Sequence, residues 1–284
     1  MIRLGIAAVG LMVLSACNGG GGGGGGSGTL TIEATDAPFV HGIVDEAWVD
    51  VSAIRIHSDA AADMGFLTLY SGAPIRLDLL KLRNGVTKQL VTADLPSGSY
   101  GQLRLVFSAG YLRLENGNEY STANGDLHFT SQGTSGQKVF ISPPLQVTDG
   151  VARTVLLDFD LTKTFHPIPA SDPLNANTYS LHPVLRVANL STAGEIRGTV
   201  TGDDGTGQLA AVDKATVYVV SPGEDDVANA IATTATEFDG TYAILGLPPG
   251  TYDVLASDGA RSARSDGEVV LAGSLTVVDL VLTP

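Results

Sequence analysis

Disulfides within the chain are excluded, because the 284-residue sequence contains a single cysteine, Cys17. Basic side chains are also few. The sequence has 16 Lys and Arg against 30 Asp and Glu, which gives a formal net charge of −14. An acidic surface argues against nucleic acid as a partner and against electrostatic docking to anionic lipid heads. Stability must therefore come from a buried core and not from cross-links.

Long hydrophobic runs are missing as well. The apolar stretch at residues 4–16 has 13 residues, well short of the roughly 20 that a membrane-spanning helix needs. It follows a basic residue and ends in small side chains, which is typical of a secretory signal. Its last residues, Leu14, Ser15 and Ala16, together with Cys17, resemble the lipobox of bacterial lipoproteins. The resemblance implies that a signal peptidase recognises the first three residues and that the Cys17 sulfur carries a lipid.

This resemblance implies a signal peptide over residues 1–16 and a membrane attachment through covalent lipid. Asn18 follows the cysteine, where lipoproteins retained at the inner membrane usually have an aspartate, so the outer membrane is predicted for a Gram-negative host. Residues 19–26 are all glycine, which favours a flexible chain. Residues 17–28 are therefore predicted to be a tether with a reach of roughly 18 Å.

Long amphipathic helices are also absent, and the remaining chain has the pattern of short strands separated by turns. Apolar residues alternate over residues 98–107, 151–161 and 179–187. Asn-Gly and Asp-Gly dipeptides lie between such runs, as hairpins require. The predicted fold class is all-β, with two tandem β-sandwich-like domains at residues 29–190 and 191–284. Their net charges are −5 (11 basic, 16 acidic) and −10 (4 basic, 14 acidic).

One short motif occurs in each predicted domain. Residues 95–100 are Leu-Pro-Ser-Gly-Ser-Tyr, and residues 247–252 are Leu-Pro-Pro-Gly-Thr-Tyr. Proline presets the turn and glycine accepts a positive φ. Tyr100 and Tyr252 are therefore predicted to turn back and bond the backbone at a sheet corner.

Four segments of the second domain carry a family resemblance. Residues 194–200, 215–219, 237–244 and 247–252 are similar to carboxypeptidase regulatory-like, or prealbumin-like, domains. The resemblance covers essentially all of residues 194–284. It implies a seven-strand β-sandwich without catalysis of its own, and related sandwiches bind sugars or act as spacers.

The first domain resembles a bacterial family known as domain of unknown function 4382. The resemblance spans nearly all of residues 29–190 and implies an extracytoplasmic β fold with no assigned activity. The matching segments are residues 35–38, 78–80, 95–105, 157–160 and 181–187.

Nucleophilic catalysis has no candidate in the sequence. No serine lies in a Gly-x-Ser-x-Gly elbow, and the single cysteine is assigned to lipid. The five histidines never occur at metal-ligand spacing. No catalytic residue, metal ligand or cofactor is therefore predicted.

Several acidic groups are interpreted as local structure, with Ca²⁺ or acid–base chemistry as the alternative. Asp203, Asp204 and residues 224–226 are expected to be solvated loop tips, because they lack the spacing of a calcium loop. A second group lies near a proline and is interpreted as turn-forming. Its members are Asp36, His41 and Asp45.

Two carboxylates on one predicted strand are stronger candidates. Asp158 and Asp160 are two residues apart, and paired carboxylates perform acid–base chemistry or bind Ca²⁺. Arg186, on a later strand, offers an ion pair that fixes the strand register. The ion pair is favoured because an unpaired buried carboxylate is unfavourable.

Trp48, the only tryptophan, is expected to anchor the core.

The sequence thus predicts a membrane-anchored cell-envelope lipoprotein that acts as a non-enzymatic binding or structural/adhesion module, with an extracellular glycan or protein as partner and no nucleic acid. One alternative is carbohydrate binding by the second domain through the loop aromatics Tyr218 and Phe238. The other is a metal-dependent hydrolase in the first domain. It requires four residues to converge in one pocket: Asp36, His41, Asp158 and His166.

Overall fold

The computed structural model describes residues 26–37, 43–59, 65–129 and 136–284. Almost all regular structure in this part is β, and the only α-helix there, α1 (Leu161–Thr164), has 4 residues. The prediction of an all-β fold is confirmed. Cys17, Leu14, Ser15, Ala16, His41 and nearly all of the glycine run lie outside the described residues. Within them, no helix is long and apolar enough to cross a membrane.

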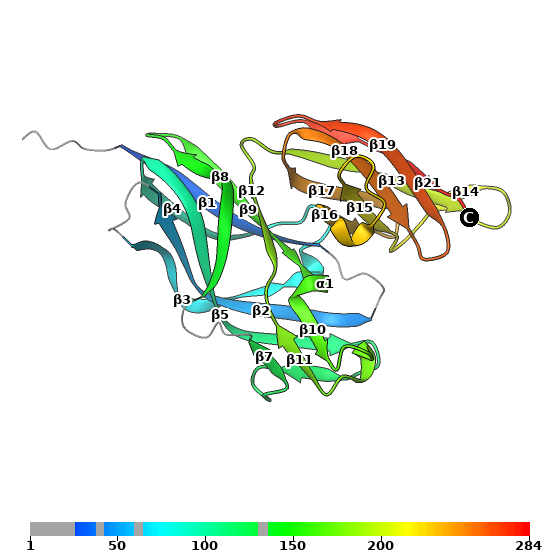
Figure 1. Cartoon of the computed structure of the whole chain (residues 1–284), viewed down its shortest axis with the longest axis horizontal. Helices are drawn as coiled ribbons and strands as arrows, with labels where there is room; N and C mark the ends of the chain where they lie inside the picture. The colour runs from blue at the N-terminus through cyan, green and yellow to red at the C-terminus, as the bar shows by residue number, and fades with distance from the viewer. Residues whose placement is uncertain (1–25, 38–42, 60–64, 130–135) are drawn as a thin grey trace, which may run out of the picture.

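The N-terminal unit is built from two main sheets and one small sheet (Figure 1). The larger sheet has the order β3-β2-β5-β6, with β8 also paired to β5. Its strands are β2 (Val44–Ser58), β3 (Phe66–Asp78), β5 (Gly98–Leu114), β6 (Glu119–Ser121) and β8 (Gln137–Val147). The second sheet has the order β12-β9-β1-β4. Its strands are β1 (Ser27–Ala37), β4 (Lys88–Pro96), β9 (Ala152–Asp160) and β12 (Leu185–Asn189).

The small sheet and short helical turns complete this unit. The small sheet has the order β10-β11-β7, and its strands are β7 (Leu127–Phe129), β10 (Phe165–Ile168) and β11 (Thr178–Leu181). The 3-10 turns are η1 (Leu79–Lys81) and η2 (Pro173–Asn175).

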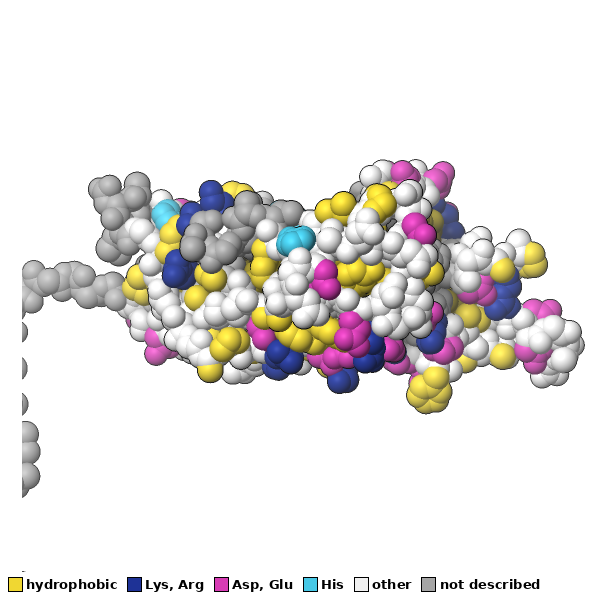
Figure 2. All heavy atoms as spheres, turned by 90° about the horizontal axis from the view of Figure 1, so that it is seen from below, with side chains coloured by type: hydrophobic (Ala, Val, Ile, Leu, Met, Phe, Trp, Pro, Cys, Tyr) yellow, Lys and Arg dark blue, Asp and Glu magenta, His cyan; other side chains and the backbone are white. Residues whose placement is uncertain are grey.

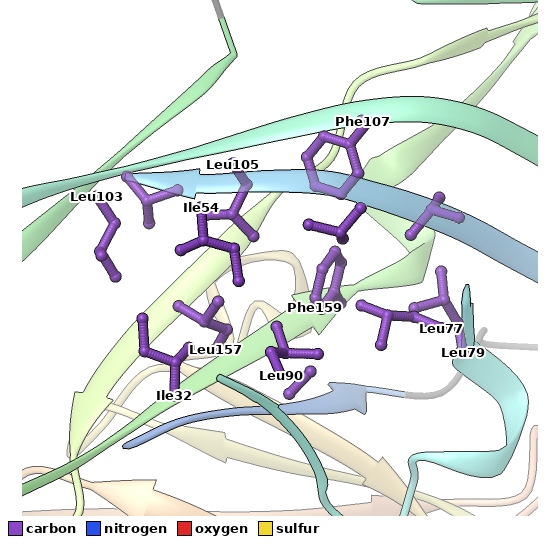
Figure 3. Packing of buried hydrophobic residues seen from close by; sticks show 14 of the residues in the cluster. Ile32, Ile54, Leu77, Leu79, Leu90, Leu103, Leu105, Phe107, Leu157 and Phe159 are labelled. Carbon is purple, nitrogen blue, oxygen red and sulfur yellow. The ribbon is translucent and has the colours of Figure 1, made fainter. Parts of the chain in front are cut away.

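The core of the N-terminal unit lies between its two main sheets. Leu103, Leu105 and Phe107 project from β5 towards Leu157 and Phe159 of β9 (Figure 3). The rings of Phe107 and Phe159 meet edge to face, with their centroids 6.3 Å apart. This geometry suits the aromatic quadrupoles and adds to the burial of apolar area. The strand alternation read from the sequence therefore creates the inner face of the sandwich.

The C-terminal unit is a second sandwich with its own core. One sheet has the order β14-β13-β17, with β20 and β21 also paired to β13, and the other has the order β16-β15-β18-β19. The first sheet contains β13 (Gly194–Asp203), β14 (Leu209–Ala211), β17 (Thr241–Leu247), β20 (Leu275–Val277) and β21 (Leu280–Leu282). The second contains β15 (Thr216–Val220), β16 (Ala232–Ala235), β18 (Gly250–Ser257) and β19 (Ser262–Val270), and η3 (Val227–Asn229) precedes β16.

The buried residues form two separate clusters. The first runs from Leu30 to Leu181, and the second runs from Ile196 to Leu282. The predicted boundary between residues 190 and 191 lies in the interval that separates them. The division into domains, with a tether at residues 17–28, stays a prediction.

Both predicted tyrosine corners form. The Tyr100 hydroxyl donates to the Pro96 carbonyl oxygen at 2.8 Å, and the Tyr252 hydroxyl donates to the Pro248 carbonyl oxygen at 2.7 Å. Each tyrosine thus bonds a backbone oxygen four residues earlier, across the turn that its own proline begins.

Trp48 corrects one prediction. It is only half-buried and lies outside the hydrophobic cluster, on the outer side of β2. Its ring stacks on Tyr111 at 5.5 Å between centroids, and the Arg76 guanidinium lies 3.5 Å from the ring centroid. Neighbouring Ala47 and Val49 take the inward positions, because successive side chains on a strand alternate between faces. The prediction of a core anchor was wrong.

Candidate functional site

The most developed polar constellation lies where the two units meet. Arg186 of β12 is the register partner of Asp158 of β9. Its Nε and Nη2 donate to Asp158 Oδ2 at 3.1 Å and 2.6 Å. The predicted ion pair is confirmed. The same guanidinium also reaches the C-terminal unit, since Nη2 donates to the Leu245 carbonyl oxygen at 2.8 Å and Nη1 donates to the Gly246 carbonyl oxygen. One side chain therefore joins both units.

Burial sets the electrostatics of this pair. The Asp158 residue is 9% exposed, and burial raises the pKa of its carboxyl, while the positive charge and hydrogen bonds of Arg186 oppose the rise. Asp160 bonds a different partner. It accepts from the Lys163 amide at the start of α1 and pairs with the Lys163 ammonium at 3.1 Å. The two carboxylates are thus used separately, as a junction anion and as a helix cap.

Strand β9 is buried on both faces, whereas the sequence predicts alternate apolar and polar positions. The strand is buried at every position from Val155 to Phe159. Val155, Leu157 and Phe159 enter the core of the N-terminal unit, whereas Leu156 lies against Gly246 of the C-terminal unit. Contact between the units therefore covers the side that the sequence pattern leaves polar.

Close backbone packing strengthens the junction. Gly246 has φ +69°, and a Cβ on it would lie 2.7 Å from Ala188 Cβ and 3.2 Å from Leu156 Cδ2. Gly85 has φ +79°, and a Cβ there would lie 3.2 Å from Ala243 Cβ. Glycine is needed at both turns because the backbones approach closely in a left-handed conformation.

A second ion pair also spans the junction. Arg83 Nε lies 3.2 Å from Glu237 Oε1, and Arg83 Nη2 lies 3.4 Å from Glu237 Oε2. Both side chains are about one-third exposed, at 34% and 33%. This bidentate pair adds orientation more than stability, because solvent screens partly exposed charges.

A cleft of 540 Å³ opens beside the junction. Its walls come from the bend of β8, the edge strand β12 and the turn between β17 and β18. The lining is mostly apolar and includes two pairs of prolines: Pro143, Pro144, Pro248 and Pro249.

The remaining candidate residues do not assemble into a reactive site in the described part of the chain. No group of three His, Cys, Asp or Glu side chains there lies at metal-binding distance. His166 is exposed on β10, and Asp158 is held by Arg186. The Asp36 backbone belongs to β1, but its side chain, like His41, is outside the described set. Asp45 pairs with Arg113 at 2.7 Å.

The acidic loops mostly bond their own backbone. Asp203 Oδ1 accepts from the amides of Gly205 and Gly207, and Asp204 Oδ1 accepts from the Thr206 amide. Glu224 Oε1 accepts from the Asp226 amide at 2.9 Å. These contacts stabilise turns. The sequence predicts solvated loop tips, and the side chains of Asp203, Asp204, Asp225 and Asp226 are exposed.

Tyr218 and Phe238, the two aromatic residues proposed to stack on sugars, differ in their exposure. Tyr218 lies within β15 and is 8% exposed, so its predicted place in a loop was wrong. Its strand is buried at all five positions. Phe238 lies in the turn before β17 and is 82% exposed.

Comparisons with solved structures return pilins at low similarity. The minor pilin GBS52 of Streptococcus agalactiae is 9% identical, with 91% of this chain and 97% of that chain covered and a TM-score of 0.23. A streptococcal ancillary pilin is 13% identical, with 90% and 63% covered and a TM-score of 0.23. The shaft pilin SpaA of Lactobacillus rhamnosus GG is 10% identical, with 91% and 97% covered and a TM-score of 0.21. TM-scores this low carry no inference about activity or partners.

The family comparison is more definite. A search of curated proteins returns no match. The family model described as "Domain of unknown function (DUF4382)" matches residues 27–183, which is more than half of the chain and includes every strand of the N-terminal unit except β12. This chain therefore belongs to the DUF4382 family.

Proposed function

We propose that this protein is a lipid-anchored module of the cell envelope that works without catalysis, as a stiff structural or adhesion element. A lipid on Cys17 fixes it to a membrane, and the glycine-rich segment separates the folded part from the lipid. The two β units then project as one body and present their outer faces to an extracellular partner.

The observation that carries this proposal is the contact of Arg186 with both units. Joined domains move relative to one another by default, unless their interface is extensive and well packed. Here the guanidinium bonds Asp158 on one side and the carbonyl oxygens of Leu245 and Gly246 on the other. A fixed junction of this kind suits an element that holds its outer faces at a set position.

Pulsed EPR distance measurement tests the stiffness. Spin labels are placed on Ala123→Cys and Ala210→Cys, two exposed positions in different units, in a Cys17→Ser background without other cysteines. We expect a narrow distance distribution for this protein and a broader one after Arg186→Gln. Arg261→Gln, which removes an arginine bonded to Asp258 and Asp203 within the C-terminal unit, is the control. A distribution that is already broad before mutation contradicts the proposal.

The anchor has its own test. Metabolic palmitate labelling and membrane partition of the full-length chain are expected to disappear with Cys17→Ser and to persist with Asn18→Ser. Labelling that survives loss of the cysteine would exclude the anchor while leaving the stiffness result intact.

A further inference from the structure

The outer face of the larger sheet in the N-terminal unit holds a row of cations. Arg55 of β2 is the register partner of Arg104 of β5, and Arg104 is the register partner of Lys138 of β8. Their inward-facing neighbours, such as Ile54, Leu103 and Val139, are buried in the core, so the three cations point to the opposite side. Each of three adjacent strands thus carries one positive charge on this face, and neighbouring strands of a sheet lie about 4.8 Å apart.

An aromatic row runs beside the cations, two residues along each strand. His57 is the register partner of both Phe66 and Gln102, and Gln102 is the register partner of Phe140. The His57 ring lies 5.1 Å from the Phe66 ring, and the Arg104 guanidinium lies 4.1 Å from the same ring. Phe140 is 70% exposed. Figure 2, seen from below the view of Figure 1, shows basic, histidine and hydrophobic side chains towards the left.

The cations of this face have no acidic partner in the described part of the chain. Elsewhere in the protein most arginines bond a carboxylate, and the examples are Arg76, Arg113, Arg186, Arg261 and Arg264. Asp59, two residues beyond His57, is held by the Ser99 hydroxyl at 2.8 Å. Unpaired positive charge is therefore concentrated on one face of a chain with net charge −14.

This arrangement opposes the stability of the unbound sheet. Like charges directly opposite on neighbouring strands repel, and Arg55 faces Arg104, which faces Lys138. In addition, Gln102 Nε2 and Arg104 Nε are buried without a hydrogen-bond partner. Breaks in the rules of sheet stability are expected at functional sites. A negatively charged occupant with many oxygens would relieve the repulsion between the three cations.

We propose that this face binds an acidic polysaccharide, a chain of sugars that carry carboxylate or sulfate groups. The guanidinium groups of Arg55 and Arg104 suit the planar, bidentate recognition of such anions, and Lys138 adds a point charge. Phe140 offers an exposed ring on which the apolar face of a sugar can stack. Lys138 and Phe140 are exposed on the outer face of β8, and the three cations lie across the strands, which fits a polymer that runs in that direction.

Charge selects this occupant over a membrane surface. The net negative charge of the whole protein would repel a broad anionic bilayer. A single polysaccharide strand contacts only the row of cations. The inference goes beyond the proposed stiff module and does not depend on a lipid at Cys17.

Affinity electrophoresis and calorimetry on the full-length chain in non-ionic detergent test the proposal, with polygalacturonate, chondroitin sulfate and neutral dextran as probes. We expect binding to at least one acidic polymer, weaker binding at higher salt, and none to dextran. Arg55→Gln with Lys138→Gln is expected to weaken binding about tenfold, since each lost ion contact contributes up to about 1 kcal/mol and 1.4 kcal/mol is tenfold.

Matched controls separate the face from general effects. Phe140→Ala is expected to weaken binding several-fold, whereas Phe238→Ala, which removes an exposed ring from the other unit, leaves it unchanged. Lys81→Gln, which removes an exposed lysine elsewhere, also leaves it unchanged. Equal losses in the controls, binding to dextran, or no binding to either acidic polymer would overturn the proposal. So would binding of the Cys17→Ser chain to phosphatidylglycerol vesicles in place of the polymers.

Discussion

Asp158 and Asp253 are both buried and paired with arginine, yet their environments differ. Asp158 sits between the units and depends on the Arg186 guanidinium for the hydrogen bonds to its carboxylate. Asp253 lies inside the C-terminal unit, where Gly223 and Gly267 donate their amides at 2.7 Å and 2.8 Å, and Arg264 Nη2 donates at 2.5 Å. The first pair joins two units, and the second organises loops of one unit.

The pKa values move in opposite directions for a physical reason. Burial raises the pKa of Asp158, because one arginine does not fully replace the lost water. The Gly223 and Gly267 amides, assisted by Arg264, hold the pKa of Asp253 below its ordinary value. Backbone donors that are already fixed stabilise a carboxylate without ordering a long side chain. The number of fixed donors thus decides how well each buried charge is tolerated.

Removal of the arginine gives the largest expected difference between the two pairs. Arg186→Gln leaves Asp158 buried without its cation, so we expect a loss of about 3–5 kcal/mol in the free energy of unfolding. Arg264→Gln should have a smaller effect, because Asp253 keeps two amide donors. Denaturant unfolding of both variants measures the difference, and an equal loss would contradict the comparison.

The sequence predicts the Asp158–Arg186 pair but not its reach into the second unit. Strand periodicity and charge type identify a carboxylate that needs a cation. The carbonyl oxygens of Leu245 and Gly246 carry no side-chain signal, so nothing local in the sequence indicates that Arg186 bonds them. The all-β class and both tyrosine corners are likewise recoverable from local patterns.

The cation row shows the same limit more clearly. Arg55, Arg104 and Lys138 come from three strands separated by many residues, and no short motif contains them. Only the pairing register places them side by side. The prediction for Trp48 was wrong for a related reason, since its apolar neighbours predict a strand but not which face of it meets the core.

The Asp253 carboxylate gives the next prediction, which concerns pH. Its folded pKa is below the unfolded value, so its contribution to stability is present above the unfolded pKa and is lost as pH falls through the folded pKa. Asp253→Asn should reduce stability by about 2 kcal/mol at neutral pH, because a buried amide or the Arg264 charge loses its acceptor. This deficit should shrink in acid, as unfolding measured from pH 7 down to pH 2 will show.

Asp158 should behave in the opposite way. Its folded pKa is above the unfolded value, so its proton-linked contribution is greatest below the unfolded pKa and is lost as pH rises through the folded pKa. The unfolding free energy that Asp158→Asn loses relative to the wild type should therefore be largest in acid and smaller at neutral pH. The same unfolding series measures it. The same trend in both variants would contradict the opposite pKa shifts.

Backbone contact at the junction gives a smaller effect. Gly246→Ala introduces a Cβ at φ +69° that overlaps Ala188, with an expected loss of about 2 kcal/mol from strain and overlap. Gly259 has φ +91°, and a Cβ added there would meet no atom within 4 Å, so Gly259→Ala should lose only about 1 kcal/mol from strain. Thermal unfolding of both variants isolates the part that arises from contact between the units.

The tyrosine corners provide the smallest and most symmetrical comparison. Tyr100→Phe and Tyr252→Phe each remove one hydroxyl that donates to a proline carbonyl oxygen, while the buried ring remains. We expect each to lose about 1 kcal/mol of unfolding free energy, the usual contribution of one hydrogen bond. The two corners share the pattern Leu-Pro-x-Gly-x-Tyr and the type of bond partner, and their bond lengths are 2.8 Å and 2.7 Å. Similar losses would therefore show that one motif contributes equally in two different sandwiches. A large loss at only one corner would mean that its surroundings, and not the shared motif, determine its contribution.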